Sequence, residues 1–296
     1  MLPEVVRLLR CPHCAAGLDA VGRTLRCASG HAFDVARQGH VTLTSGRTRL
    51  AGDTAAMVAA REAVLAAGHH RSLVEAVVEA AVEAVTADSG AAAAISTGQV
   101  GSSAVPVGAL LDVGAGTGHH LAATLDRLPE YVGLALDASP YAARRGARAH
   151  PRAGAVVCDV TRPLPVRDGA VAVVLDVFAP RNGPELARVL RPGGALVVVT
   201  PLPDHLGELV GPLGLLGVDP QKQDRLASAL DPYVTRVRQS EVRVPLSLPR
   251  EDVVALAAMG PSAWHVDPDT LRDRVSRLDA PVRVTLAAEV AVFRRP

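Results

Sequence analysis

The stretch that decides the fold is ALLDVGAGTGHH, which runs from Ala109 to His120. Its apolar beginning, residues 110–113, predicts a buried parallel strand, and glycines follow at positions 114, 116 and 118. Residues 121–128 then show the apolar spacing of a helix. A strand that ends in a glycine turn and opens a helix lets a ligand approach bare backbone. The stretch therefore predicts a ligand-binding strand–loop–helix unit.

An acidic residue closes the next predicted strand at the distance expected for ribose recognition. That strand covers residues 132–136, and Asp137 lies nineteen residues past Gly118. The loop is not the G-x-G-x-x-G dinucleotide motif, because His119 occupies the third glycine position. The spelling Asp112-x-Gly114-x-Gly116-x-Gly118 instead resembles the first motif of the S-adenosylmethionine (SAM) methyltransferases.

From residue 109 onward, apolar strands alternate with helices. We expect strands near 110–113, 132–136, 155–158, 171–177 and 195–200, closing antiparallel strands near 241–248 and 282–293, and helices between these two at about 250–259 and 268–278. Continuous apolar strands suit a parallel sheet covered on both faces. The predicted fold class is α/β, a doubly wound, mostly parallel sheet of the SAM-dependent methyltransferase type over residues 109–296, with its ligand at the carboxyl edge.

Three of the four cysteines cluster near the start of the chain. Cys11, Cys14, Cys27 and His31 have C-x2-C-x12-C-x3-H spacing, which suits a tetrahedral Zn²⁺ site. His13 has the wrong phase to join its two neighbours as a ligand. A site with four protein ligands is closed, so this zinc is expected to be structural. It would replace the core that a module as short as residues 1–50 could not build.

Charge and composition bound the remaining possibilities. Residues 1–50 carry seven arginines against three acidic residues, net +4, so the rest of the chain is −3 given the total of +1. A basic amino-terminal module predicts contact with a polyanion, and a face of solvated arginines is the alternative. The sequence contains neither an apolar run of about 20 residues nor a signal-peptide core, so we expect a cytoplasmic protein without a membrane partner.

Two segments separate the module from the first strand of the sheet. Residues 51–85 carry two helical patterns, the first beginning at an Asp53-Thr54 N-cap and stopping at Gly68, the second running from about Ser72 to Val85. Residues 86–108 have no period and few charges, which predicts a flexible insertion.

The motifs together resemble one family, the zinc-containing 23S rRNA guanine-N1 methyltransferases, and within it the tylosin- and mycinamicin-type macrolide-resistance branch. The matching stretches include CPHC at 11–14, GHAFDVARQG at 30–39, LDVGAGTGHH at 111–120, FAPRN at 178–182 and MGPSAW at 259–264. They occur in order along the whole chain apart from residues 86–108.

The resemblance implies a substrate, two bound groups and an oligomeric state. The substrate would be N1 of a guanine in a 23S rRNA hairpin at the peptide exit tunnel, where methylation would block macrolide binding. The bound groups would be SAM and structural Zn²⁺, and known relatives form homodimers. The implied zinc ligands are Cys11, Cys14, Cys27 and His31; the implied cofactor residues are Gly116, Thr117, His205 and His70, the last standing where many relatives have Tyr.

Further cofactor and substrate residues follow from position in the fold. Asp112, Gly114, Gly118 and Asp137 belong to the loop and its acid, and Asp159, at the end of the third strand, stands where such folds contact the adenine amino group. At the end of the fourth strand, Phe178 would stack on the base, the Pro180 turn would present carbonyls to the guanine edge, and Asp176 would accept the N1 proton, although the family keeps no acid there.

Alternatives stand beside several of these roles. Phe178 would otherwise be a core aromatic that covers the sheet, and Trp264 would either pack on the C-terminal helix or stack on substrate. Cys158 is expected in the core. Arg37, Arg47, Arg49 and Arg61 would bind phosphates, or would be ordinary surface residues.

Two rival functions remain open at this point. The first is a small-molecule SAM methyltransferase, which unlike an RNA enzyme would not lose activity steeply as salt rises. The second is a non-catalytic zinc-ribbon RNA-binding protein, which would show no turnover.

Overall fold

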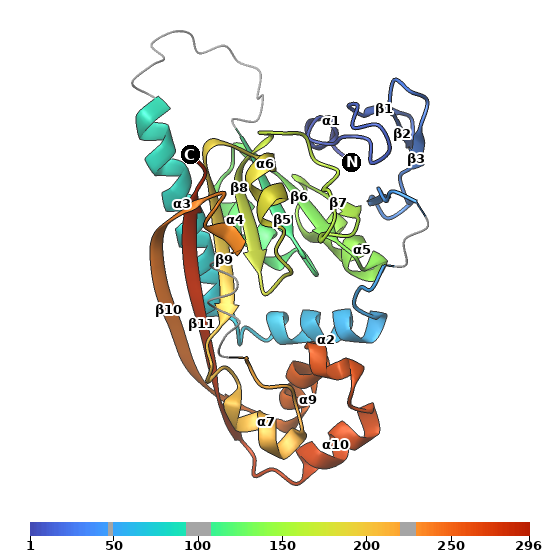
Figure 1. The fold of residues 1–296 in the computed structure, drawn as a ribbon. Coiled ribbons are helices and arrows are strands. Elements are labelled where there is room, and N and C mark those ends of the chain that lie inside the picture. Colours follow the sequence, from blue (N-terminus) through green and yellow to red (C-terminus); the bar gives the residue numbers. More distant parts are fainter. Residues whose placement is uncertain (47–49, 93–107, 220–228) are drawn as a thin grey trace.

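An eight-stranded sheet organises the computed structural model, which describes residues 1–46, 50–92, 108–219 and 229–296 (Figure 1). The strand order is β10-β11-β9-β8-β5-β6-β7-β4. The strands are β4 (Val41–Thr42), β5 (Gly108–Val113), β6 (Tyr131–Asp137), β7 (Ala153–Val157), β8 (Val171–Val177), β9 (Leu190–Pro201), β10 (Thr235–Leu248) and β11 (Val282–Arg294).

The pairing confirms the predicted mostly parallel sheet with an antiparallel closing pair. Neighbours from β4 through β9 run parallel, whereas β11 is antiparallel to both β9 and β10. Two strands begin earlier than predicted, β9 at Leu190 and β10 at Thr235. Cross-strand bonding extends them, because Leu190 pairs with Val171 of β8 and Thr235 pairs with Arg294 of β11.

Helices cover one face of the sheet. They are α3 (Arg71–Ala92), α4 (His119–Arg127) and α5 (Pro140–Ala149), and their apolar side chains share a core with β5 to β9 and β11. α3 continues beyond its predicted end at Val85 into the predicted insertion, whose alanines favour a helix. The remainder of that insertion, residues 93–107, lies outside the described residues.

The N-terminal segment covers much of the other face. Between β7 and β8, residues 158–170 form no helix, and α1 (Pro3–Val6) and the zinc-binding module pack there together with α6 (Gly183–Val189). Val5 and Leu9 are fully buried in this core. Burial of each such side chain stabilises the fold by roughly 1.5–3 kcal/mol, so the segment contributes to the main core.

The module itself is a small antiparallel sheet that continues into the large one. It contains β1 (Asp19–Val21), β2 (Thr24–Arg26) and β3 (Ala32–Asp34). β4 then leaves the module and pairs with β7, so that Val41 lies opposite Val156. The module is therefore joined to the large sheet by backbone hydrogen bonds.

A helical cap lies beyond the carboxyl ends of the central strands. We call the cap the elements α7 (Gly207–Leu213), α9 (Arg250–Ala258), η1 (Pro261–Trp264) and α10 (Pro268–Ser276). The three α-helices share a separate core, and η1 packs on α9. α2 (Ala55–Ala66), capped by the Thr54 hydroxyl, packs on α9 and lies between the cap and the sheet (Figure 1). Among the described helices, none has the length and apolarity needed to cross a membrane.

Candidate functional site

The glycine loop after β5 requires residues without a side chain. Gly114 and Gly118 have φ values of 69° and 77°, in the left-handed region that favours glycine. A Cβ on Gly114 would lie 2.6 Å from the Cβ of Ala179, and one on Gly118 would lie 3.0 Å from the Cα of Gly146. The loop, which also carries Gly116 and Thr117, is thus held between α5 and the segment after β8, with its backbone available to a ligand.

Asp137 lies beneath this loop, at the end of β6. Its carboxylate accepts hydrogen bonds from the N–H of Gly116 at 2.8 Å and from that of Ser139 at 2.7 Å. Burial raises the pKa of Asp137, and these two N–H groups oppose that rise. Each carboxylate oxygen keeps a further lone pair, which suits a ribose hydroxyl.

Asp112 is a second carboxylate under the loop, 2 % exposed. Burial raises its pKa well above the ordinary value, and its Oδ2 has no hydrogen-bond partner within the described residues. A buried acceptor without a partner is costly, so this atom marks a place where a bound group could complete the bonding.

Two histidines with little exposed surface, His70 and His205, also lie near the loop. His70, only 4 % exposed at the start of α3, has an unpartnered Nδ1, and burial lowers its pKa to about 4. Burial also lowers the pKa of His205, whose Nδ1 lies 2.9 Å from the carbonyl oxygen of Ala287 and 3.3 Å from its nitrogen. Neutral imidazoles do not repel a cation, so the surroundings accept a positively charged sulfonium.

Phe178 has an unusual backbone and an open ring. Its φ is 54°, a strained value for a residue with a side chain, and its N–H donates to the carbonyl of Val199 at 3.2 Å. The ring is 42 % exposed and its centroid lies 5.6 Å from that of His205. Pro180 is exposed beside it. The ring is therefore not part of the core, and the strained turn directs it toward the predicted cofactor residues.

Asp176 lies below this turn and does not reach the open surface. Its side chain is 0 % exposed, and its Oδ1 lies 3.3 Å from Nε of Arg181, itself 4 % exposed. Arg181 also donates from Nη2 to the carbonyl of Val199 at 3.0 Å. Burial raises the pKa of Asp176 to about 7, against the opposing effect of Arg181. In this position the carboxylate cannot touch a base. The sequence did not identify Arg181 as the partner of Asp176, although Arg181 belongs to the FAPRN stretch.

Asp159 follows β7 but is engaged by its own loop. It accepts hydrogen bonds from the hydroxyl of Thr161 at 2.6 Å and from its N–H at 3.0 Å, and it pairs with Nε of Arg162 at 3.3 Å. The Thr161 hydroxyl is the main cause of its lowered pKa. The preceding residue, Cys158, is 2 % exposed, which confirms its predicted place in the core.

Arg61 connects three parts of the chain near the glycine loop. Its Nη1 lies 2.5 Å from Oδ2 of Asp53, and its Nη2 donates to the carbonyl of Met259 in the cap at 3.0 Å. The same guanidinium lies 3.1 Å from where a Cβ of Gly116 would be. Arg61 is thus bound within the protein rather than free for a phosphate. Of the other predicted phosphate ligands, Arg37 is exposed and Arg47 and Arg49 lie outside the described residues.

The predicted zinc ligands come together in the N-terminal module. One ligand atom from each of Cys11, Cys14, Cys27 and His31 lies within 4.8 Å of the others. The Sγ atoms of Cys14 and Cys27 are 3.7 Å apart, and Nδ1 of His31 lies 3.3 Å from Sγ of Cys27. A tetrahedral Zn²⁺ with Zn–S bonds of about 2.3 Å separates two sulfurs by about 3.8 Å, so the residues fit the metal. His13 stacks on Phe33 instead, with ring centroids 5.8 Å apart.

Comparison with known proteins gives matches to both parts of the chain. A family model for the N-terminal zinc ribbon of RlmA matches residues 9–44, and a methyltransferase domain model matches residues 110–194. A Streptomyces fradiae protein, 23S rRNA (guanine(748)-N(1))-methyltransferase, is 49 % identical over 99 % of both chains. A Micromonospora griseorubida protein that carries the name of a 23S rRNA (guanine-N(1)-)-methyltransferase is 51 % identical over 99 % of both chains.

Proposed function

Because this chain belongs to the family of 23S rRNA (guanine-N1)-methyltransferases, which are SAM-dependent enzymes with a structural zinc, we propose that it methylates N1 of a guanine in a 23S rRNA hairpin at the peptide exit tunnel. The observation that carries this proposal is the sequence identity of 49 % with a guanine-N1 methyltransferase over 99 % of both chains. On this proposal the methyl group blocks macrolide binding and protects the cell. The enzyme would act in the cytoplasm, where its substrate is found.

The glycine loop and its acids would hold the methyl donor. Asp137 would bond the ribose, the backbone at Gly116 and Thr117 would contact the rest of the donor, and Asp112 would support the loop. His70 and His205 would line the sulfonium end as neutral groups. The bound donor supplies a methyl group on a cationic sulfur, for which little acid or base help is needed at carbon.

The turn after β8 would hold the target base. The exposed ring of Phe178 would stack on a guanine splayed out of its loop, and the turn at Pro180 would present carbonyls to the guanine edge. As the bond from N1 to the methyl carbon forms, the bond from sulfur to that carbon breaks and the N1 proton leaves to solvent. Asp176, buried with Arg181, would position this turn rather than take the proton itself.

A primer-extension assay tests the function directly. Purified protein is incubated with a 23S rRNA hairpin and labelled SAM, and the RNA is then copied by reverse transcriptase. N1-methylguanine cannot form its normal base pair, so we expect one new stop within the hairpin. Label incorporation without such a stop, or no incorporation at all, would contradict the proposal.

The salt dependence of the same assay separates the rival functions. Activity on RNA should fall steeply between 50 and 200 mM salt by the general rule for phosphate contacts, here about tenfold or more. A small-molecule methyltransferase would lack this fall, and a non-catalytic RNA-binding protein would bind the hairpin without turnover. A homodimer is a further expectation from the family, which sedimentation equilibrium of the full chain would test.

A further inference from the structure

A cavity of about 410 Å³ lies between the zinc-binding module and the methyltransferase sheet. Three segments line it: residues 10–15 of the first zinc knuckle, residues 43–45 after β4, and residues 158–164 after β7. Its volume lies within the range of about 300–1,000 Å³ that is usual for small-ligand sites. It opens at the carboxyl ends of two strands, the edge where open α/β sheets bind their ligands.

This cavity borders the predicted donor site without including its loop. The glycine loop at 114–118 and Asp137 do not line it, and among the predicted donor residues only Asp159 does. The turn at Phe178, which would hold the target base, follows β8, and β8 is three strands away from β7 in the sheet, about 14 Å at the usual spacing of about 4.8 Å. The cavity is thus near enough to receive another nucleotide of the loop that contains the target base.

The polar groups that line the cavity suit a base and ribose better than a phosphate. Thr44 offers a hydroxyl and His13 an exposed imidazole, while Arg162, 58 % exposed, is paired with Asp159. Donors and acceptors are both present, and the charged pair sums to zero. A phosphate here would face the Asp159 carboxylate, whereas a heterocycle can stack on the Arg162 guanidinium and bond with either partner.

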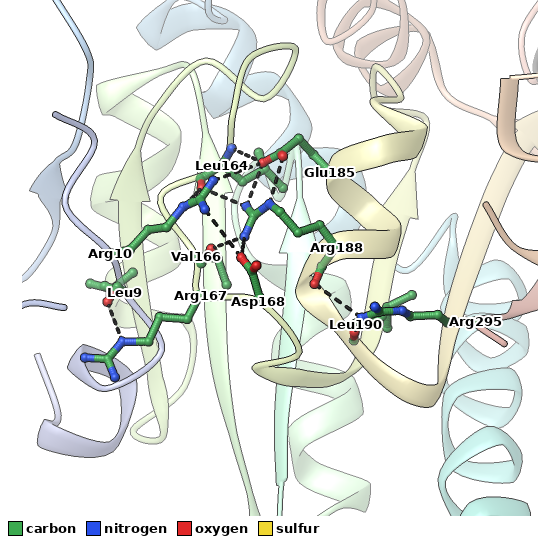
Figure 2. A network of polar contacts seen from close by, with 10 residues as sticks. All are labelled: Leu9, Arg10, Leu164, Val166, Arg167, Asp168, Glu185, Arg188, Leu190 and Arg295. Carbon is green, nitrogen blue, oxygen red and sulfur yellow. Dashed lines mark hydrogen bonds and ion pairs between the residues drawn. The ribbon is translucent and has the colours of Figure 1, made fainter. Parts of the chain in front are cut away.

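A network of ion pairs and hydrogen bonds holds one wall of the cavity in place (Figure 2). The carbonyl of Leu164 accepts from Nε of Arg10 at 3.2 Å and from Nη2 of Arg188 at 3.1 Å, and its N–H donates to Glu185 at 2.6 Å. Arg10 also lies 3.4 Å from Asp168 and 3.6 Å from Glu185. Arg10 directly precedes the zinc ligand Cys11, so the network fixes the zinc knuckle against the loop after β7.

These contacts also neutralise Arg10, which leaves little charge in the cavity for a phosphate. The exposed arginines of the module, Arg26 and Arg37 among them, lie outside the cavity lining. Nonspecific binding of single-stranded nucleic acid combines such outer charges, which follow the backbone, with sites that receive bases.

We propose that this cavity receives one unpaired nucleotide of the rRNA substrate, a neighbour of the methylated guanine in the same loop. Arg162 stacks on its base, and Thr44 and Asp159 bond its edge or its ribose. The inference rests on the proposed function for the identity of the RNA. The cavity would then set the distance along the loop between the zinc knuckle and the methylated base.

Binding measurements on hairpins with missing bases test this inference. Fluorescently labelled hairpins, each abasic at one loop position, are titrated with the full-length zinc-loaded protein, and affinity is read by anisotropy. For the wild type, we expect one abasic position other than the target guanine to raise the Kd about tenfold, as is usual for loss of a stacked base. Thr44→Phe, which fills the cavity, should raise the Kd of the intact hairpin about tenfold. In this variant the hairpin that is abasic at the sensitive position should bind no more weakly than the intact hairpin, while the effects of the other abasic positions should stay as in the wild type.

Further variants make the outcome decisive. Arg162→Ala should also raise the Kd of the intact hairpin and reduce the effect of the same abasic position. It replaces Thr44→Phe as the test if that variant fails to fold. Arg277→Ala, which removes an exposed arginine at the end of α10 in the cap, is the matched control and should not change the position dependence. Zinc content and melting temperature show whether each variant is folded.

Two outcomes would overturn the inference. One is that each abasic position raises the Kd by the same factor in the cavity variants as in the wild type. The other is a rise in the Kd for SAM, measured by calorimetry, because the cavity would then belong to the donor site. Since anisotropy reads binding without turnover, a wild type that binds the hairpin but does not methylate it would contradict the proposed function and leave this test intact.

Discussion

At the scale of single residues, the turn at Phe178 combines strain with exposure. A non-glycine residue in the left-handed region costs about 1–2 kcal/mol, and this one keeps a large ring partly in solvent. Neither feature stabilises the fold. Strain and exposure at one residue agree with the proposed role of the ring in holding substrate.

Two substitutions at Phe178 separate the ring from the strain. Phe178→Gly and Phe178→Ala both remove the ring, so both should lower activity on the hairpin about tenfold to a hundredfold by loss of stacking. Only glycine relieves the backbone, so Phe178→Gly should be more stable than Phe178→Ala by about 1 kcal/mol. Urea denaturation and hairpin methylation measure the two effects. Equal activity of either variant with the wild type would remove Phe178 from the substrate site.

The pair beneath that turn predicts a dependence of stability on pH. Above about pH 4 an unfolded chain has lost the Asp176 proton, whereas burial lets the folded chain keep it until about pH 7. The folded state therefore binds more protons in this range, and Asp176 makes the free energy of unfolding fall as pH rises through it. Arg181 limits this fall because it stabilises the ionised carboxylate.

Arg181→Met should consequently destabilise the protein more at high pH. We expect a loss of about 3 kcal/mol at pH 8, where an unpaired charge remains buried, and a clearly smaller loss at pH 5, where Asp176 is protonated. Denaturant melts at the two pH values measure this difference. The double variant with Asp176→Asn carries no charge at this pair, so the difference between its losses at the two pH values should disappear. For Arg181→Met alone, a loss that is the same at both values would contradict the assignment.

At the scale of elements, α2 connects the glycine loop to the cap. Its Arg61 pairs with Asp53, bonds the carbonyl of Met259 and lies against Gly116. Next to it on α2, Glu62 pairs with Arg145 of α5 at 2.7 Å, at a more exposed position. The two arginines make similar contacts, but only the first is adjacent to the loop.

Arg61→Ala should raise the Kd for SAM about tenfold, because charged contacts of about 1.5–3 kcal/mol with Asp53 and the Met259 carbonyl would no longer fix the guanidinium that lies against Gly116. Arg145→Ala is the matched control and should change the Kd by less than about twofold, as expected for a surface pair. Isothermal titration calorimetry on both variants gives the comparison. Equal effects of the two substitutions would mean that the loop does not depend on α2.

The elements also show what the sequence can predict. The five parallel strands of the core, the glycine loop, Asp137 and the zinc ligands were recognisable, because each is encoded by residues close together in the chain. The bond of Arg61 to Met259 was not, because it joins residues 198 positions apart. The pairing of Asp176 with Arg181 is close in the chain, but it depends on the turn conformation between them, which no apolar spacing reports. The early start of β9 depends likewise on its pairing with β8, which no local pattern reports.

At the scale of the whole molecule, the zinc-binding module belongs to the main core. Leu9, Leu25 and Val41 are buried in the same cluster as side chains of β5 to β9. The basic charge of residues 1–50 predicts contact with a polyanion, but no local pattern predicts that the module takes the place of a helix between β7 and β8. Loss of the metal should therefore affect the whole fold.

Cys27→Ala should lower the melting temperature of the entire protein by about 10 °C, since removal of one zinc ligand costs several kcal/mol. The transition should remain single because the module and the sheet share a core. Cys158→Ala, which removes the one cysteine outside the zinc site, is the control and should shift the melting temperature by only a few degrees. Thermal denaturation with a parallel metal assay measures both, and a separate early transition in Cys27→Ala would show an independent module.

The position of the N-terminal segment also dictates an order of events during synthesis. The four metal ligands are complete once His31 has been translated, but the groups that Leu9 and Arg10 contact, Val166 and Glu185, follow His31 by 135 and 154 residues. Until then, Leu9 and Arg10 lack these partners, although Val5 already has its neighbour Gly154 in β7. A nascent chain halted before residue 160 should thus carry a metal-bound head whose Leu9–Arg10 segment is not yet docked, and should be the form that chaperones hold.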